Sequence, residues 1–183
     1  MTWNHMEAET YLAGETVFKG RIVSVRVDSV ELPGGGTAGR EVVEHRPAAV
    51  VVPIDSDGNV VLVRQYRYPV GKTLLEAPAG IIEEAEAPEA GAQRELQEEI
   101  GFRARALRYL GGFWSTPGFC DERMHVFLAT DLEPSRLEPD ADENITVERF
   151  SVSEIREMIQ NGEIEDAKTI AALLMALCPN SEE

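Results

Sequence analysis

Three glutamates fall within five consecutive positions of the stretch "RELQEEIG" (Arg94–Gly101). If the stretch is helical, Glu95, Glu98 and Glu99 share one face, at i, i+3 and i+4. Like charges at this spacing destabilise a helix by about 0.2–0.5 kcal/mol per pair. The helix dipole also opposes anions near the C-terminal end, which Gly101 predicts. A bound divalent cation would offset this cost, whereas a solvated acidic face is the alternative interpretation.

The chemistry open to this cluster is that of hard oxygen ligands. Carboxylates hold Mg²⁺, which keeps part of its water shell and clamps phosphate oxygens. Such an ion polarises phosphorus, activates water and orients a leaving group. Glu95 and Glu99, one helical turn apart, can hold an ion from one side, and Glu98 can share a second ion or orient water. Arg94 precedes Glu98 by four residues and can fix its carboxylate.

The helix that must carry these side chains is predicted over Ala87–Ile100. Pro88 suits the first turn of a helix, and Glu89 suits its positive end. Apolar residues recur beside the glutamates at the spacing of a buried stripe, at Ala92, Leu96 and Ile100. The helix therefore presents one face to a core and the acidic face to a ligand or to solvent.

The elements around this helix predict one mixed α/β domain. Alternating, Val-rich segments are typical of strands, and they occur at Arg21–Leu32, within Arg40–Ile54, at Val60–Pro69, at the start of Leu74–Glu84, on both sides of Thr116–Arg123, and from Ile145. A long acidic loop, Leu132–Asn144, precedes the last strand, and two helices follow it. In the second of these helices an i, i+3, i+4, i+7 pattern predicts a core stripe of Ile170, Leu173, Leu174 and Leu177.

Composition limits the classes of partner. The chain has 183 residues, a formal net charge of −16 and 43% hydrophobic residues. This balance argues against binding to nucleic acid or to an anionic membrane surface. No apolar run approaches the roughly 20 residues of a membrane helix, and the N-terminus lacks the pattern of a signal peptide. Two cysteines without paired spacing fit a reducing compartment, so we expect a cytoplasmic protein.

Extended backwards, the glutamate stretch resembles the Nudix hydrolase signature. Gly80 is followed by five residues, then Glu86, then seven residues, then "RELQEEIGF". The resemblance implies a Nudix α/β/α sandwich with a mixed sheet. It also implies hydrolysis of a nucleoside diphosphate linked to another group, with Mg²⁺ or Mn²⁺ as cofactor. It assigns the metal to the carboxylates of Glu95, Glu98 and Glu99 and to the main-chain carbonyl of Ala79.

Four further segments resemble the ADP-ribose pyrophosphatase branch of that family: "EHRPAAVVVP", "VRQYRYPVG", "LEAPAGIIE" and "TPGFCDERMHVFLA". Pro117 lies fifteen residues beyond Phe102, near an offset associated with ADP-sugar substrates. The expected reaction is hydrolysis of ADP-ribose to AMP and ribose 5-phosphate. The alternatives are another nucleoside diphosphate sugar such as GDP-mannose, a dinucleotide such as NADH, and a sensor that binds without hydrolysis.

Carried over by position, the resemblance implies a set of substrate contacts. Ile22, Glu44 and Arg46 are expected near the adenine, where Ile22 replaces a platform that is aromatic or aliphatic in the family. Arg67 is expected to contact a phosphate, and Glu76 to lie near the terminal ribose or the metals. Ordinary surface ion pairs are the competing interpretation of the two arginines.

The resemblance also implies a general base in the acidic loop before the last strand, where Glu143 is the best match, with Asp142 and Glu98 as rivals. Related enzymes are dimers whose N-terminal strands complete the partner's adenine site. We therefore expect a homodimer, with residues 1–36 as a β extension involved in dimerisation and residues 37–183 as the hydrolase domain.

Overall fold

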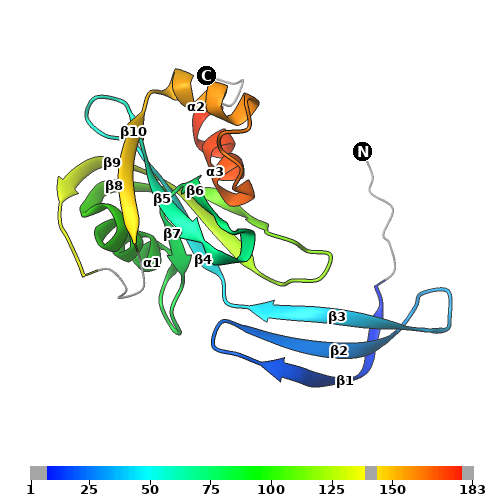
Figure 1. Cartoon of the computed structure of the whole chain (residues 1–183). Helices are drawn as coiled ribbons and strands as arrows, with labels where there is room; N and C mark the ends of the chain where they lie inside the picture. The colour runs from blue at the N-terminus through cyan, green and yellow to red at the C-terminus, as the bar shows by residue number, and fades with distance from the viewer. Residues whose placement is uncertain (1–7, 139–143, 179–183) are drawn as a thin grey trace. The chain divides into compact units, whose positions relative to one another are not determined.

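The structure is a computed structural model, and it describes residues 8–138 and 144–178. The chain divides into two compact units. One comprises the chain through Arg46 together with Trp114–Glu122, and the other comprises Pro47–Phe113 and the chain from Arg123 onward. Figure 1 labels the elements of both units.

The first unit is an antiparallel three-stranded sheet in the order β1 (Thr10–Lys19), β2 (Val23–Glu31) and β3 (Thr37–His45). Strand β3, which the sequence analysis grouped with the hydrolase domain, pairs with β2 along its length and belongs to this unit. The segment Trp114–Glu122 joins it through β3, since Val43 N–H donates to the Phe119 carbonyl at 2.7 Å. Strand β1 is not evident from the sequence pattern, because all ten of its residues are exposed and no core imposes alternation.

The second unit contains two sheets. One has the order β10 (Ile145–Phe150), β5 (Val60–Arg67) and β6 (Lys72–Glu76). The other has the order β7 (Ala79–Ile81), β4 (Ala48–Pro53), β9 (Arg123–Pro134) and β8 (Phe102–Trp114), whose last residue falls in the first unit. Strand β4 pairs parallel to β9 and antiparallel to β7, so this sheet is mixed.

Helices cover both sides of the central strands. Residues of β4 alternate between two cores, with Val50 and Val52 in one and Ala49 and Val51 in the other. The first core also contains residues of α2 (Val152–Gln160) and α3 (Ala167–Leu177), and the second contains residues of α1 (Pro88–Glu95) and of the turn after it. The predicted α/β/α sandwich with a mixed sheet is therefore confirmed.

The predicted helix Ala87–Ile100 is present, but its geometry changes within it. Helix α1 begins at Pro88 and ends at Glu95, and a π-helical turn, η2 (Leu96–Ile100), continues it. Gly101 ends the turn with φ 76°, the left-handed conformation expected of a C-terminal glycine. The apolar stripe Ala92, Leu96 and Ile100 is buried as predicted. A π turn holds one extra residue, so the glutamates beyond Glu95 depart from the 100° spacing assumed above.

The stripe predicted in α3 is partly wrong. Leu173 is fully buried, but Leu174 is 47% exposed. The buried face of the helix is Thr169, Ala172 and Leu173, which places Leu174 outside it. Nearly every residue of α3 is apolar, so periodicity alone could not fix its rotation.

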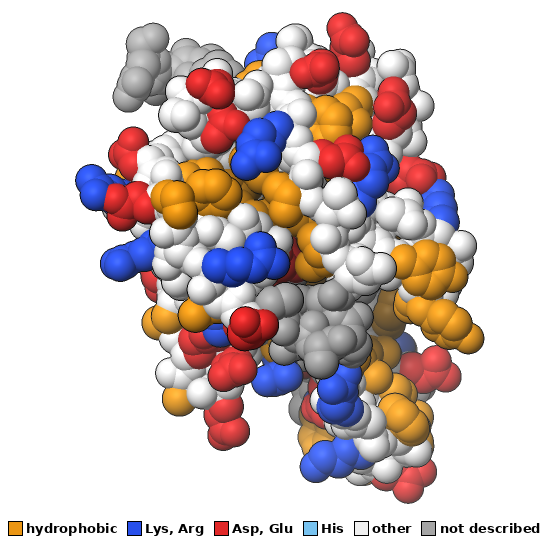
Figure 2. Space-filling view, turned by 60° about the vertical axis from the view of Figure 1, so that its left-hand side comes forward, with side chains coloured by type: hydrophobic (Ala, Val, Ile, Leu, Met, Phe, Trp, Pro, Cys, Tyr) orange, Lys and Arg blue, Asp and Glu red, His pale blue; other side chains and the backbone are white. Residues whose placement is uncertain are grey.

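The visible surface mixes acidic, basic and apolar side chains (Figure 2). None of the helices in residues 8–138 and 144–178 combines the length and apolarity needed to cross a membrane.

Candidate active site

The glutamate cluster is organised around Arg94. Its Nη1 donates to Glu95 Oε1 at 2.6 Å and to Glu98 Oε2 at 2.8 Å. Its Nε donates to Glu86 Oε1 at 3.0 Å, and its Nη2 donates to the Ile81 carbonyl at 2.9 Å. One guanidinium thus ties three carboxylates of the signature to strand β7, and the i, i+4 contact with Glu98 is the one that the spacing predicts.

These contacts change the acid–base properties of the cluster. Burial disfavours the charged form of Arg94, but its carboxylate partners outweigh that penalty and raise its pKa above the ordinary value. The hydrogen bond from Arg94 lowers the pKa of Glu86. Arg94 is therefore a permanent cation, and it offsets part of the repulsion between the glutamates.

Glu95 and Glu99 point toward strand β7. Both are buried, with 6% and 5% of their surface exposed. The Ala79 N–H donates to Glu99 Oε2 at 3.1 Å. A Cβ at Gly80 would overlap the Glu95 carboxylate, with Oε2 at 2.5 Å, so only glycine leaves room for it. The strand residue that the resemblance assigns as a metal ligand, Ala79, thus contacts Glu99, and the next residue, Gly80, adjoins Glu95.

The donor set fits a divalent cation in chemistry. Buried carboxylates cost free energy unless cations or hydrogen bonds satisfy them, and hard carboxylate and carbonyl oxygens are the ligands that Mg²⁺ takes. Within residues 8–138 and 144–178, however, no group of three or more His, Cys, Asp or Glu side chains is close enough to enclose a metal. Arg94 Nη1 lies between Glu95 and Glu98 instead. The three carboxylates lie on α1 and η2, and the fourth assigned ligand, the Ala79 carbonyl, lies on β7.

Arg67 forms an ion pair, as its competing interpretation expected, and its partner is Glu76. Arg67 makes a bidentate contact with Glu76: its Nε donates to Oε1 at 2.8 Å and its Nη2 donates to Oε2 at 2.7 Å. Glu76 is only 1% exposed, and Lys168 Nζ also donates to its Oε2. Both oxygens of Glu76 are therefore engaged by protein cations, whereas the Arg67 side chain is 38% exposed.

Electrostatics favours the ionised form of this pair. Burial raises the pKa of Glu76, but Arg67 and Lys168 outweigh burial and lower it below the ordinary value. The Glu76 hydrogen bonds raise the pKa of Arg67, and Glu99 adds a smaller attraction in the same direction. Arg67 is thus a fixed cation within the electrostatic reach of the glutamate cluster.

The residues expected near the adenine line one cavity in the first unit. Ile22, Glu44 and Arg46 border a space of about 370 Å³. Arg26 Nη1 donates to Glu44 and its Nε donates to Asp28 Oδ2 at 2.8 Å, which holds the Glu44 carboxylate in the cavity wall. Pro117 lies in the segment of this unit that bonds to β3, although it does not border the cavity.

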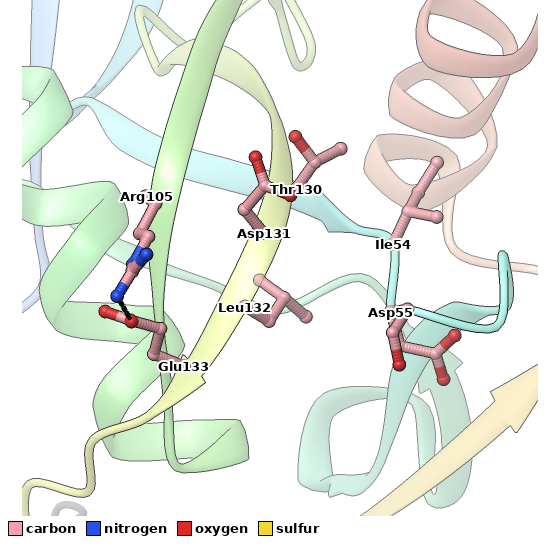
Figure 3. A pocket seen from close by; sticks show the side chains of 8 residues that line it. Ile54, Asp55, Arg105, Thr130, Asp131, Leu132 and Glu133 are labelled. Carbon is pink, nitrogen blue, oxygen red and sulfur yellow. Dashed lines mark ion pairs between the residues drawn. The ribbon is translucent and has the colours of Figure 1, made fainter.

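A larger cavity of about 500 Å³ lies elsewhere in the second unit (Figure 3). The residues after β4 and at the end of β9 border it, and Arg105 pairs there with Glu133. None of the predicted site residues that the structure describes lines it. The described residues of the predicted site therefore lie away from this larger cavity.

The expected base, Glu143, and its rival Asp142 lie outside the described residues. They fall between β9, which ends at Pro134, and β10, which begins at Ile145. Glu98, the third candidate, is held by Arg94.

Comparison with known proteins agrees with this geometry. The NUDIX domain model matches residues 44–173, and the nucleoside diphosphate sugar hydrolase N-terminal domain model matches residues 9–43. The chain is 38% identical to an ADP-ribose pyrophosphatase of Bacillus subtilis (strain 168) over 167 residues, covering 90% of each. It is 40% identical to an ADP-ribose pyrophosphatase of Mycobacterium tuberculosis (strain ATCC 25618 / H37Rv), covering 89% of this chain and 80% of the relative.

A crystal structure of an ADP compounds hydrolase superposes with a TM-score of 0.86 at 27% identity, covering 95% of each chain. The glutamates around Arg94, the glycine that admits Glu95 and the domain match over most of the chain lead to one conclusion: this protein belongs to the Nudix family of hydrolases.

Proposed function

We propose that this protein hydrolyses ADP-ribose to AMP and ribose 5-phosphate with Mg²⁺ as the metal. The observation that carries the proposal is the pair of buried carboxylates, Glu95 and Glu99, held against Ala79 and Gly80. The similarity to two ADP-ribose pyrophosphatases over most of the chain supports the choice of substrate.

The site residues divide into three tasks in the proposed reaction: holding the cation, fixing the carboxylates and binding a phosphate. Glu95, Glu98, Glu99 and the Ala79 carbonyl hold the cation, which when bound polarises the pyrophosphate and activates water. Arg94 fixes Glu98 and keeps the crowded carboxylates in place. Arg67 offsets the negative charge of a phosphate, with its guanidinium oriented by Glu76.

The first unit binds the nucleoside in this proposal. Ile22, Glu44 and Arg46 recognise the adenine, and the Pro117 segment borders the substrate. The unit also mediates a homodimer, since β1 exposes all of its residues at the edge of its sheet. The unpaired Cys120 and Cys178 support a cytoplasmic location.

A substrate panel tests the proposal. At equal free Mg²⁺, ADP-ribose should give a higher kcat/KM than GDP-mannose, ATP or NADH, because adenine and terminal-ribose contacts act together across one pyrophosphate. Release of AMP and ribose 5-phosphate identifies the reaction. A preference for GDP-mannose would refute ADP-ribose as substrate and would favour another nucleoside diphosphate sugar, the class named by the N-terminal domain match.

The base can be separated from the metal ligands by kinetics. A general base contributes about 10²–10⁴-fold to rate, so Glu143→Gln should lower kcat by at least about a hundredfold and leave KM and the Mg²⁺ dependence unchanged. Glu98→Gln should instead shift the Mg²⁺ dependence. Asp142→Asn controls for loss of loop charge and should cost little. A Glu143→Gln variant with nearly full activity would return the role of base to Glu98.

A further inference from the structure

The N-terminus of α3 makes a compact set of contacts with the end of β6. Asp166 caps the helix by accepting from Thr169 N–H at 3.0 Å. Lys168 Nζ donates to Asp166 Oδ2 at 2.9 Å and to Glu76 Oε2. The Ala77 N–H donates to Thr169 Oγ1 at 2.8 Å. Two consecutive residues of α3, Lys168 and Thr169, thus contact Glu76 at the end of β6 and Ala77 after it.

This contact set continues directly to Arg67, because Glu76 also accepts from its guanidinium. Lys168 and Arg67 approach the same carboxylate from different elements, α3 and β5. The bidentate contact requires the Glu76 carboxylate to stay in the plane of the Arg67 guanidinium. Lys168 binds the Oε2 atom of that carboxylate and restricts its rotation. Arg67 still has N–H groups that Glu76 does not use, because a guanidinium carries five.

The exposed fractions of the three side chains indicate which of them can contact a ligand. Glu76 is 1% exposed and the Lys168 side chain 17%, whereas the Arg67 side chain is 38% exposed. A substrate phosphate therefore reaches Arg67 before it reaches the other two. We propose that Lys168 is a positioning residue for the reaction, which acts through Glu76 to orient Arg67 toward the pyrophosphate, with Asp166 and Thr169 holding the lysine and its helix in place. The inference rests on the proposed function in one respect, the contact of Arg67 with a phosphate.

A purely structural role of Lys168 and a role in positioning Arg67 predict different effects of its loss on kcat/KM. If Lys168 only fastens α3, its loss affects activity to the same degree whether or not Arg67 is present. If it acts through Arg67, its loss has no further effect once Arg67 is gone. A double-mutant cycle separates the two cases.

The cycle compares wild type, Lys168→Met, Arg67→Gln and the double variant, by kcat/KM with whichever nucleoside diphosphate compound the wild type cleaves fastest. Mutation of a residue that supports a site typically lowers activity about 10–100-fold. Lys168→Met should therefore lower kcat/KM by that factor when Arg67 is present. In the Arg67→Gln background the same change should cost no more than about twofold, the usual error of additivity. Lys168→Arg, which keeps the charge, should retain most of the activity. Equal losses in both backgrounds would overturn the inference, as would a fully active Lys168→Met.

The chain offers a matched control. Lys72 pairs with Glu165 just beside this network, but both side chains are about half exposed, at 49% and 50%. Exposed pairs contribute little, so Lys72→Met should leave kcat/KM unchanged. Thermal unfolding verifies that each variant is folded, and Lys168→Gln replaces Lys168→Met if the latter is not. Because the cycle uses the best substrate found, a higher kcat/KM for a diphosphate other than ADP-ribose would refute the proposed substrate, and the cycle would still decide the role of Lys168.

Discussion

Replacing Glu99 by glutamine should abolish nearly all hydrolysis while leaving the fold intact. Glutamine keeps the shape of the side chain and an oxygen that can accept the Ala79 N–H, now bonded at 3.1 Å. It removes one of the negative charges that attract a divalent cation and replaces a carboxylate ligand by a weaker, neutral amide oxygen. Loss of supporting partners of metal ligands costs about 10–100-fold, so loss of a ligand itself should exceed about a hundredfold in kcat/KM.

The same variant should lose its response to metal in thermal unfolding. Mg²⁺ or Mn²⁺ should raise the Tm of the wild type by mass action and should not raise that of Glu99→Gln. Without metal, the variant should be as stable as the wild type or slightly more stable, because one repulsive charge is gone. Glu157→Gln, an exposed glutamate of α2, is the matched control and should behave as wild type. Wild-type turnover in Glu99→Gln would show that this carboxylate is not a ligand.

Adding one methyl group at Gly80 should be almost as damaging. A Cβ there would overlap the Glu95 carboxylate, and the clash can be relieved only by moving the end of that side chain or the strand. The flexible side chain moves at lower cost, so Gly80→Ala should fold but hold Glu95 away from the cation. We expect kcat/KM to fall by at least about a hundredfold, as for loss of a ligand, together with a weaker Mg²⁺ dependence.

Gly39→Ala is the control for a glycine-to-alanine change within a strand. Gly39 lies in β3, and a Cβ there would meet no atom within 4 Å. It should therefore leave activity and Mg²⁺ dependence unchanged. If Gly80→Ala keeps its activity and its Mg²⁺ dependence, the close approach of Glu95 to β7 has no role in metal binding.

Local features of the site could be predicted from sequence because they depend on short separations. Gly101 ends its helix, Pro88 begins it, and Arg94 bonds to Glu98 four residues on. Each of these depends on backbone geometry within one or two turns. Gly80 and Glu86 could be assigned to the same site only because their spacing resembles the signature of a family.

Features that depend on distant packing were not predictable. Lys168 and Glu76 are 92 positions apart, and no periodicity links them. The π turn inserts a residue after Glu95, and nothing in "LQEEI" distinguishes it from an ordinary helix. Strand β1 has no buried face that could impose an alternating pattern. In each case tertiary contacts, which local propensity does not encode, decide the outcome.

Binding of Mn²⁺, followed by electron paramagnetic resonance, tests most directly whether the crowded glutamates hold a cation. Wild type and Glu157→Gln should bind Mn²⁺ with equal affinity, and Gly39→Ala should match them. Glu99→Gln should bind at least about tenfold more weakly, given the losses typical of altered metal sites. If Glu99→Gln and Gly80→Ala both bind Mn²⁺ as tightly as the wild type, the cation is held elsewhere and "RELQEEIG" is only a solvated acidic face braced by Arg94.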